Sequence, residues 1–458
     1  MTPILRVAAA TAVLAGHLSP ALAAVDADEA RQLGNTLTPW GAEKAGNNDG
    51  TIPAYTDGYV KPPAGFDPKN PQLRPDPFAV EKPLYSVTPA NLARYTDKLS
   101  DGAKALLQKY PDFRMDVYPT HRTQRYPAHV NERSLRNATA CRTTHDGLAL
   151  EGCYGGVPFP IPKTGNEVMW NHNLRYQSPS YVANFRNMMV DAGGGINLQG
   201  ELDICQEYPA FNPESSALLK PADPYWMVHV DWTGPARKAG EKLVLVDYID
   251  PIKNRRKVWQ YLPGQRRVKL TPELAYDTPN PESGGAAVMD EATLFNGGQD
   301  RFDFKLIGKK EMLIPYNAFK LFDESACPDS KRYLKGHPGP DCLRWELHRV
   351  WEVEATLKAG SRHVYAKRKF YFDEDQPEVG ASDNYDAAGK LYRAVFGLYF
   401  PFYETADQGF GDASITIDFQ TGAYLVQDDY AHGYFQPMAK RQPSRFFTGD
   451  ALAAEGLR

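Results

Sequence analysis

The sequence lacks two features that would assign a chain to a familiar class. After residue 23 it has no apolar run near the ~20 residues that a membrane-spanning helix needs, and its mean hydropathy is -0.51. It also lacks an excess of one charge, since 52 Lys and Arg residues face 56 Asp and Glu residues. A nearly balanced chain has no electrostatic footprint for nucleic acid and no polybasic patch for a membrane surface.

Catalytic signatures are also missing. The sequence contains no Gly-x-Ser-x-Gly, no His-Glu-x-x-His and no Gly-x-x-x-x-Gly-Lys-Ser/Thr motif, and Gly193-Gly194-Gly195 lacks the spacing of a dinucleotide site. His121 and His172 come closest to an enzymatic pattern, but a general base needs a nucleophile and an orienting acid beside it. We therefore expect no enzyme, no catalytic residue and no cofactor, with a hydrolase as a minor alternative.

Cysteine is scarce, and its spacing is informative. Of five cysteines, Cys141 and Cys153 bracket one turn-rich segment, Cys327 and Cys342 bracket another, and Cys205 is left over. We interpret the two pairs as disulfides, each worth about 3 kcal/mol through loop closure. Zinc is the competing interpretation, but the sequence has no Cys-x-x-Cys pair, and we expect no metal site.

The amino terminus has the composition of a secretory signal. Arg6 supplies positive charge, residues 7–18 are mostly apolar, and Ala21-Leu22-Ala23 is a small-x-small cleavage site. We expect cleavage after Ala23. Because no cysteine stands at that junction, we expect a soluble mature chain without a lipid anchor or a transmembrane segment.

Two regions follow the expected signal peptide of residues 1–23. Residues 24–83 are rich in Pro, Gly, Asn and Asp, which predicts an extended arm that runs over a larger body, residues 84–458. Helices are expected within residues 88–110, where Thr88-Pro89 is a start signal, and at Pro213–Leu219.

Most of the larger region has the pattern of β-strands. In residues 345–357 mainly apolar odd positions alternate with mainly polar even ones, which predicts one buried and one solvated face, and residues 363–372 complete a hairpin. The other expected strands are Tyr225–Trp232, Leu243–Ile249, Lys257–Leu262, Leu391–Tyr399, Ser414–Phe419 and Tyr424–Gln427. Short connections favour antiparallel pairing. We predict a mainly β (α+β) fold, a large curved antiparallel sheet that forms an open half-barrel with helices on its concave side.

Several motifs in one order resemble a known family. They are Leu37–Asn47, Gly50–Tyr55, Tyr118–Thr123, Gly156–Pro162, Glu167–Tyr176, Val258–Val268, Asp277–Pro279, Asp300–Phe319 and Arg349–Leu357. This set is similar to domain of unknown function 1329, whose members are often labelled outer-membrane lipoprotein-sorting proteins. The resemblance implies the half-barrel of the periplasmic carriers LolA and LolB and a periplasmic location in a Gram-negative bacterium. It also implies an inner-membrane exporter of the resistance-nodulation-division type and an outer-membrane barrel protein as partners.

Large aromatic side chains are the candidate lining of such a half-barrel, because apolar hollows with few polar groups are the usual small-molecule sites. Ordinary core packing is the competing interpretation for any single ring. The candidates are Trp170, Trp226, Trp259, Tyr261, Phe302, Phe304, Trp345 and Trp351. Two basic pairs, Arg266-Arg267 and Lys309-Lys310, are weaker candidates for contact with lipid phosphate, since exposed basic residues are mostly solvated.

The leading hypothesis is a periplasmic carrier that shields a hydrophobic ligand, such as a lipid, a sterol-like molecule or the acyl chain of a lipoprotein, between the two membranes. The alternative is an accessory subunit that bridges the exporter and the barrel protein and docks through its Pro-rich arm. Deletion of residues 24–60 would separate the two, since a carrier would keep its ligand and a docking subunit would lose its partner. The sequence does not name the cargo.

Overall fold

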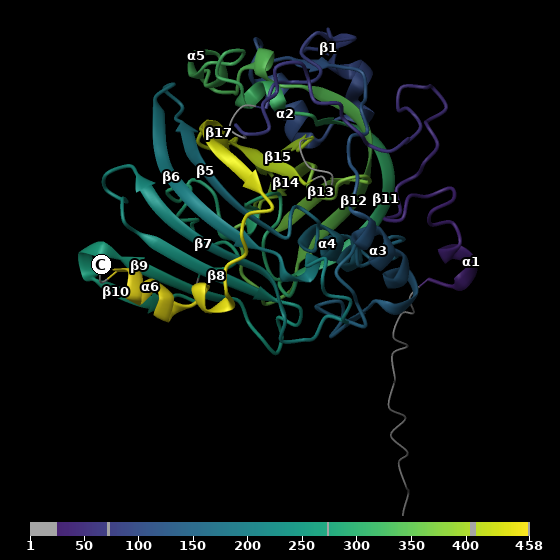
Figure 1. Ribbon diagram of the computed structural model, residues 1–458. Coiled ribbons are helices and arrows are strands. Elements are labelled where there is room, and N and C mark those ends of the chain that lie inside the picture. The colour runs from purple at the N-terminus through teal and green to yellow at the C-terminus, as the bar shows by residue number, and fades with distance from the viewer. Residues whose placement is uncertain (1–24, 71–73, 273, 404–408, 457–458) are drawn as a thin grey trace, which may run out of the picture.

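The computed structural model describes residues 25–70, 74–272, 274–403 and 409–456, so the expected signal peptide lies outside the described residues (Figure 1). None of the described helices is long and apolar enough to cross a bilayer. The α-helices are α1 (Ala27–Ala30), α2 (Asp101–Lys109), α3 (Ala128–Ala140), α4 (Gly165–Asn173), α5 (Asp329–Arg332) and α6 (Gly449–Gly456). The 3-10 turns are η1 (Leu92–Lys98), η2 (Pro209–Phe211), η3 (Pro263–Gln265), η4 (Met289–Glu291), η5 (Phe319–Phe322), η6 (Pro340–Cys342) and η7 (Ser444–Phe446).

One large sheet dominates the molecule. Its strands follow the order β1-β2-β12-β13-β14-β15-β16-β17-β5-β6-β7-β8-β9-β10, with β11 beside β12, and the ends β1 and β10 do not meet. Neighbours pair antiparallel except β2 with β12. The strands are β1 (Tyr85–Val87), β2 (Met115–Val117), β3 (Arg142–Thr144), β4 (Ala149–Glu151), β5 (Ser180–Val190), β6 (Ile196–Glu207), β7 (Pro224–Gly234), β8 (Lys242–Tyr248), β9 (Lys257–Leu262), β10 (Arg267–Leu270), β11 (Phe302–Pro315), β12 (Trp345–Leu357), β13 (Lys367–Asp373), β14 (Gly380–Tyr385), β15 (Leu391–Pro401), β16 (Phe410–Asp418) and β17 (Tyr424–Pro437). The predicted mainly β fold with an open antiparallel sheet is confirmed.

The expected strands correspond to β7, β8, β9, β12, β13, β15, β16 and β17, and β9 and β12 have the predicted bounds. The helix expected at Pro213–Leu219 is wrong, because that segment consists of turns and irregular chain. The solvated face expected for β12 is also wrong in its first half. Glu346 and His348 are at most 1% exposed there, because they belong to a buried ionic network.

One face of the sheet, called the inner face here, can be followed from strand to strand through the register. Val395 of β15 pairs with Thr416 of β16. Ser414 lies two residues before Thr416 on the same face of β16, and it pairs with Gln427 of β17. Across β5 to β8 the same face continues through paired apolar residues, because side chains alternate along a strand. These are Ala183, Ile204, Val230 and Leu243.

Helices cover both faces of the sheet. On the inner face, Val168 and Met169 of α4 pack against Val353, Phe370 and Val395. Segment 271–301 lies on the same face, since its Leu294 and Phe295 belong to that cluster. The sequence analysis placed all helices on the concave side. The structure divides them, because α2 and α6 pack against the opposite, outer face.

Helix α2 is attached to the outer face by a cap and a close contact. Gly102 lies directly on Ala394 of β15, and a side chain at position 102 would collide with it. The buried carboxylate of Asp383 accepts hydrogen bonds from the backbone N–H groups of Asp101 and Gly102, both at 2.8 Å. Burial raises the pKa of Asp383 to about 6, against the lowering effect of these hydrogen bonds. A carboxylate at a helix N-terminus stabilises the helix dipole.

The amino-terminal arm is part of the core. Trp40, Ala42 and Ile52 are at most 6% exposed and belong to the same hydrophobic cluster as Val130 and Tyr176 of the body. Residues far apart along the chain therefore share one interior.

Both expected disulfides are confirmed. Cys141 is bonded to Cys153 next to α3, and Cys327 is bonded to Cys342 next to α5. Cys205 is free and half-buried in β6, and burial raises the pKa of its thiol to about 12, so it stays protonated near neutral pH.

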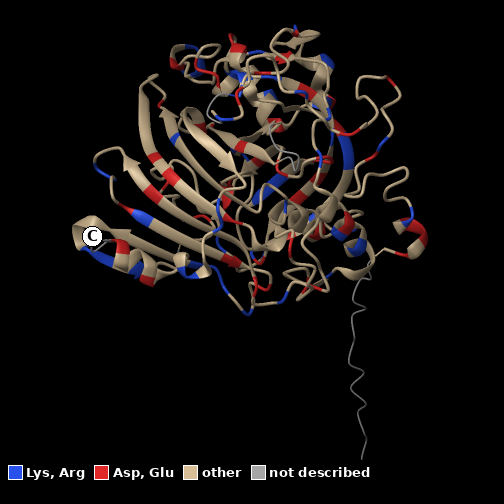
Figure 2. Ribbon diagram, in the orientation of Figure 1, with Lys and Arg blue, Asp and Glu red and all other residues tan. Residues whose placement is uncertain are grey.

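Lys and Arg residues are interspersed with Asp and Glu residues along the chain (Figure 2).

A buried ionic network lies beside β12. His348 is within 3.3 Å of Glu346 through Nε2 and within 3.2 Å of Asp373 through Nδ1. Arg122 donates to Asp375 at 2.6 and 2.8 Å, and Arg344 pairs with Glu346. Burial alone would lower the pKa of His348, but the carboxylates of Asp373 and Glu346 outweigh it and raise the pKa to about 9.

The folded protein therefore holds His348 as a cation over a wider pH range than the unfolded chain. The resulting stabilisation is fully present below pH 6.5, declines above it and is lost as the pH passes about 9. We expect the free energy of unfolding, measured by urea titration, to fall across this window. A His348→Gln variant should be less stable at the acidic end and lack the decline. An unchanged pH profile in this variant would contradict the assignment.

Candidate functional site

A cavity lies between the inner face of the sheet and residues 280–296. Strands β5, β6, β7, β8, β16 and β17 all contribute to its wall. Water molecules could place their centres in about 80 Å³ of this inner cavity, whereas one water needs roughly 10–15 Å³. Its apolar and aromatic wall consists of Tyr181, Phe185, Ile204, Tyr208, Trp226, Val228, Leu243, Leu245, Met289, Phe295 and Tyr430.

The alternation of the strands puts these side chains on one face. Trp226 and Val228 are two residues apart on β7, and Leu243 and Leu245 are two apart on β8. The residues between them, such as Val244, belong to the cluster under α6 on the outer face. The cavity is thus the part of the inner face that α4 does not fill.

Hydrogen bonds fix the aromatic wall. Trp226 donates from Nε1 to Oε1 of Gln206, which also accepts from the Tyr208 hydroxyl at 3.1 Å. The same hydroxyl lies 2.8 Å from Gln177 Oε1. Rings held in this way present a preformed surface to a ligand, which reduces the entropy lost on binding.

Polar groups interrupt the apolar wall at a few places. Arg175 lines the cavity, but its guanidinium is ion-paired with Glu378, which is 2% exposed. Glu282, Asp412 and Asp428 line it as well, and the carboxylate of Asp412 accepts a hydrogen bond from the side-chain amide of Gln177. Burial raises the pKa of all three, to about 7 for Glu282, and repulsion from Asp412 and Glu282 raises that of Asp428 further.

A second pocket adjoins the first. It is wider, about 440 Å³, and lies between β8 and segment 271–301, with Trp170, Arg256 and Tyr276 among its lining residues. Asn173 and Tyr225 line both spaces and form the partition between them. Arg256 in this outer pocket is neutralised by Asp247, to which it donates at 2.8 and 2.6 Å.

Of the eight aromatic candidates, Trp226 lines the inner cavity and Trp170 lines the outer pocket. The other six lie outside both pockets. Trp259 and Tyr261 share the face of β9 that is turned toward α6, Phe302 and Phe304 pack near α4, Trp345 contacts Phe396, and Trp351 lies under the ammonium group of Lys309.

The sequence analysis missed most of the cavity wall. Tyr181, Phe185 and Ile204 lie on β5 and β6, for which no strand was expected. The period-two spacing of Tyr181, Ala183 and Phe185 was the available signal. Segment 280–296 gave no sequence signal of its place in the wall, because its residues follow no regular secondary-structure pattern.

Each of the two candidate histidines is held by contacts within the fold. The ring nitrogens of His172 lie 2.7 and 2.8 Å from the carbonyl oxygens of Pro377 and Phe295, so the ring joins α4 to two loops. His121 stacks on Phe78 and contacts Glu81 at 2.7 Å.

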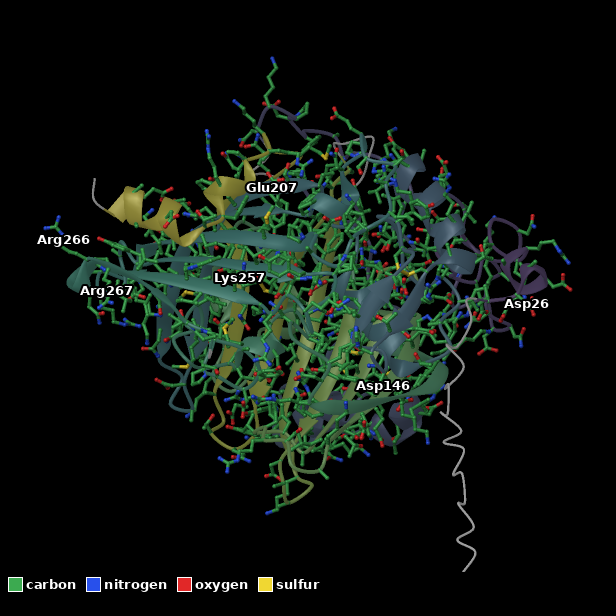
Figure 3. All side chains as sticks on the ribbon, turned by 90° about the horizontal axis from the view of Figure 1, so that it is seen from below. Asp26, Asp146, Glu207, Lys257, Arg266 and Arg267 are labelled. Atoms are coloured by element: carbon green, nitrogen blue, oxygen red, sulfur yellow. A yellow bond between two sulfur atoms is a disulfide. The ribbon has the colours of Figure 1, made fainter. Side chains whose placement is uncertain are left out.

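The two basic pairs differ in their surroundings. Figure 3 shows Arg266 and Arg267 at the tip of the β9–β10 hairpin, at the margin of the molecule. Lys309 instead binds Glu374 at 2.7 Å, and Lys310 lies 3.8 Å from Glu352.

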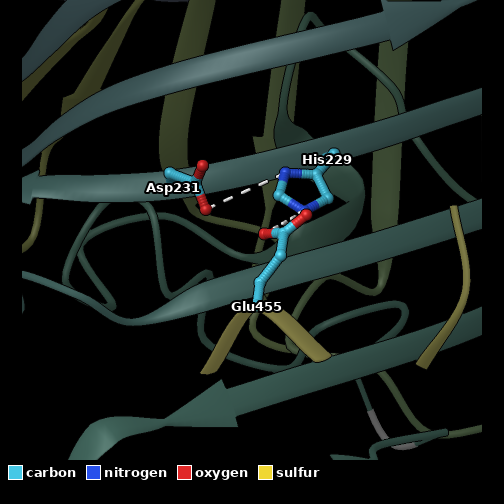
Figure 4. Close-up of side chains that lie close together, drawn as sticks. All are labelled: His229, Asp231 and Glu455. Atoms are coloured by element: carbon cyan, nitrogen blue, oxygen red, sulfur yellow. Dashed lines mark ion pairs between the residues drawn. The ribbon is translucent and has the colours of Figure 1, made fainter. Parts of the chain in front are cut away.

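A cluster of His229, Asp231 and Glu455 has the donor types of a metal site (Figure 4). However, Lys242 Nζ lies 2.6 Å from Asp231 and 3.1 Å from Glu455, where a metal ion would have to be. His229 Nε2 is 3.5 Å from Glu455. We interpret the cluster as an ionic contact that attaches α6 to β7 and β8.

The Arg175–Glu378 pair should be essential to the cavity wall. Removal of one partner of a buried pair leaves an uncompensated charge and costs about 3–5 kcal/mol. We expect Arg175→Met to lower the free energy of unfolding by this amount in denaturant titration. The double variant Arg175→Met/Glu378→Gln should recover much of the loss, and equal stability of the single and double variants would contradict the pairing.

Two sequence comparisons relate this chain to known proteins. A family model described as "Protein of unknown function (DUF1329)" matches residues 86–453. An uncharacterized protein of Pseudomonas aeruginosa is 37% identical over 457 residues, which is 98% of each chain.

Solved structures share less with this chain. A putative outer membrane lipoprotein-sorting protein domain from Vibrio parahaemolyticus is 12% identical and covers 63% of this chain and 97% of its own, with a TM-score of 0.42. A DUF1329 family protein from Desulfovibrio piger is 13% identical with the same coverage and a TM-score of 0.40. A LolA superfamily protein from Nitrosomonas europaea is 13% identical over 63% of this chain and 100% of its own, with a TM-score of 0.36. These scores are too low to transfer a site.

Proposed function

Because this chain belongs to the DUF1329 family of proteins of unknown function, we propose a function from its own geometry: it is a periplasmic carrier or binding protein for a hydrophobic ligand. The observation that carries the proposal is the inner cavity. Its wall is mainly apolar and aromatic, its rings are fixed by hydrogen bonds, and a few polar groups interrupt it. Preformed cavities of this composition are the usual small-molecule sites.

The size of the cavity limits the ligand. A short alkyl chain or a small ring system fits its free space, and each methylene taken out of water contributes about 0.8 kcal/mol. A longer tail would extend past Tyr225 into the outer pocket, whose wall includes Trp170 and Tyr276. The proposal involves burial of the ligand without a reaction.

The periplasmic location is supported by two observations. The signal-like amino terminus directs a chain to export. The two disulfides form and persist in an oxidising compartment. Transfer of the ligand between the inner and outer membranes is part of the same proposal.

The alternative of an accessory subunit that docks through residues 24–83 has less support. Trp40, Ala42 and Ile52 of this arm are buried in the core, so they are not available to a partner. Deletion of residues 24–60 would also remove part of the interior. It therefore tests folding as well as docking.

Blocking the cavity tests the carrier function directly. Leu245 is 2% exposed in the wall, whereas Leu270 on β10 is 53% exposed. We expect Leu245→Trp to weaken binding of octanol about tenfold or more by filling the space, since this corresponds to the loss of roughly two buried methylenes. Leu270→Trp is the matched control and should bind as the parent protein does. Calorimetric titration measures both, and undiminished binding by a folded Leu245→Trp protein would exclude the cavity as the site.

A further inference from the structure

The inner cavity has a charge pattern that restricts what it can hold. Resting on the proposed function, we infer that the ligand is a hydrophobic amine, with its ammonium group among Glu282, Asp412 and Asp428 and its alkyl or aryl part against the aromatic wall.

Most of the ionisable residues that line the cavity are acidic. Glu282 belongs to the covering segment, Asp412 to β16 and Asp428 to β17, so three separate parts of the chain each bring an acidic residue to one cavity. Among the described residues of the lining, Arg175 is the one cation, and its charge is already neutralised by Glu378. The lining therefore carries more carboxyl groups than cations, although, against the larger raising effect of burial, the charge of Lys238 lowers the pKa of Glu282 and that of Arg175 lowers the pKa of Asp412.

A buried amide points to a ligand independently of the acids. Gln427 lines the cavity and is 3% exposed, and its Oε1 has no hydrogen-bond partner among the described residues. A buried acceptor without a partner costs about 1–3 kcal/mol. An ammonium group carries three donors and no acceptor. It can satisfy Gln427 Oε1 and the neighbouring carboxylates together.

The aromatic rings of the wall also suit an ammonium group. Tyr181, Tyr208, Trp226 and Tyr430 line the space that the three acids border. Ring faces carry negative electrostatic potential and attract a cation within about 6 Å, by up to about 2 kcal/mol when both are desolvated. The apolar side chains Leu243 and Leu245 line the cavity too and are suited to the rest of the ligand.

Burial and mutual repulsion disfavour the ionised form of these carboxyl groups, and a bound cation would favour it. Burial raises the pKa of Asp428, and repulsion from Asp412 and Glu282 raises it further. An ammonium group placed between these carboxyls replaces repulsion by attraction. A fatty acid would add one more carboxylate to the cluster, and an alcohol would leave the cluster uncompensated.

Three probes of equal chain length separate head group from tail. We would titrate octylamine, octanol and octanoate into the purified protein by calorimetry at about pH 7.5, where an alkylamine is charged. We expect octylamine to bind about tenfold or more tightly than octanol, since hydrogen bonds to charged groups add about 1.5–3 kcal/mol, and octanoate to bind most weakly.

Variants assign the head-group contact. Asp428 has a φ of 59°, which Asn also adopts, so Asp428→Asn removes the charge and keeps the backbone. Asp428→Asn and Gln427→Leu should each weaken octylamine binding about tenfold while octanol binding changes by less than about twofold. The matched control is Asp300→Asn, which removes an acid from the outer pocket and should leave octylamine binding unchanged.

The outcomes separate the two proposals. Octanol or octanoate binding as tightly as octylamine would overturn the amine assignment and leave the carrier function standing. The same holds if Asp428→Asn and Gln427→Leu bind octylamine normally. If none of the three probes binds, the carrier function itself fails. Retained octanol binding shows that each variant is folded.

Discussion

The buried ionic network beside β12 is the constraint on which the rest of the fold depends. It connects the arm through Glu43, the segment before α3 through Arg122, strand β11 through Lys309, and the β13–β14 connection through Glu374 and Asp375. Charges taken out of water are tolerated only when each one is paired. A shift of any of these segments would leave a buried charge alone, so the network selects one arrangement of all of them.

Two of the motifs that resemble the family contribute arginines to this network. The motifs Tyr118–Thr123 and Arg349–Leu357 contain Arg122 and Arg349, whose partners are the acids of the β13–β14 connection. The cavity wall on β5 to β8 lies mostly outside those motifs. These two motifs therefore contribute to how the sheet is held, whereas the strands of the cavity wall contribute mainly apolar and aromatic positions.

The fold was more predictable than the site, for physical reasons. Strands β9 and β12 have clear alternation, and their bounds could be predicted. Strand β5 carries Asn184, Arg186 and Asn187 and was missed. Helix α4 is buried on almost every side, so it shows no polar face to mark it as a helix. The cavity joins residues from Asn173 to Tyr430, and no local pattern in a sequence indicates that such distant positions meet.

The partition formed by Asn173 and Tyr225 gives the two spaces an order. The inner cavity with Glu282, Asp412 and Asp428 lies on one side of the partition, and the wider pocket lies on the other. If the proposed amine spans both spaces, its head group would lie in the inner cavity and any remaining length in the outer pocket. On that proposal the inner cavity would select the head group, and the outer pocket would tolerate different tail lengths. A carrier built in this way would accept a homologous series of compounds that share one polar terminus.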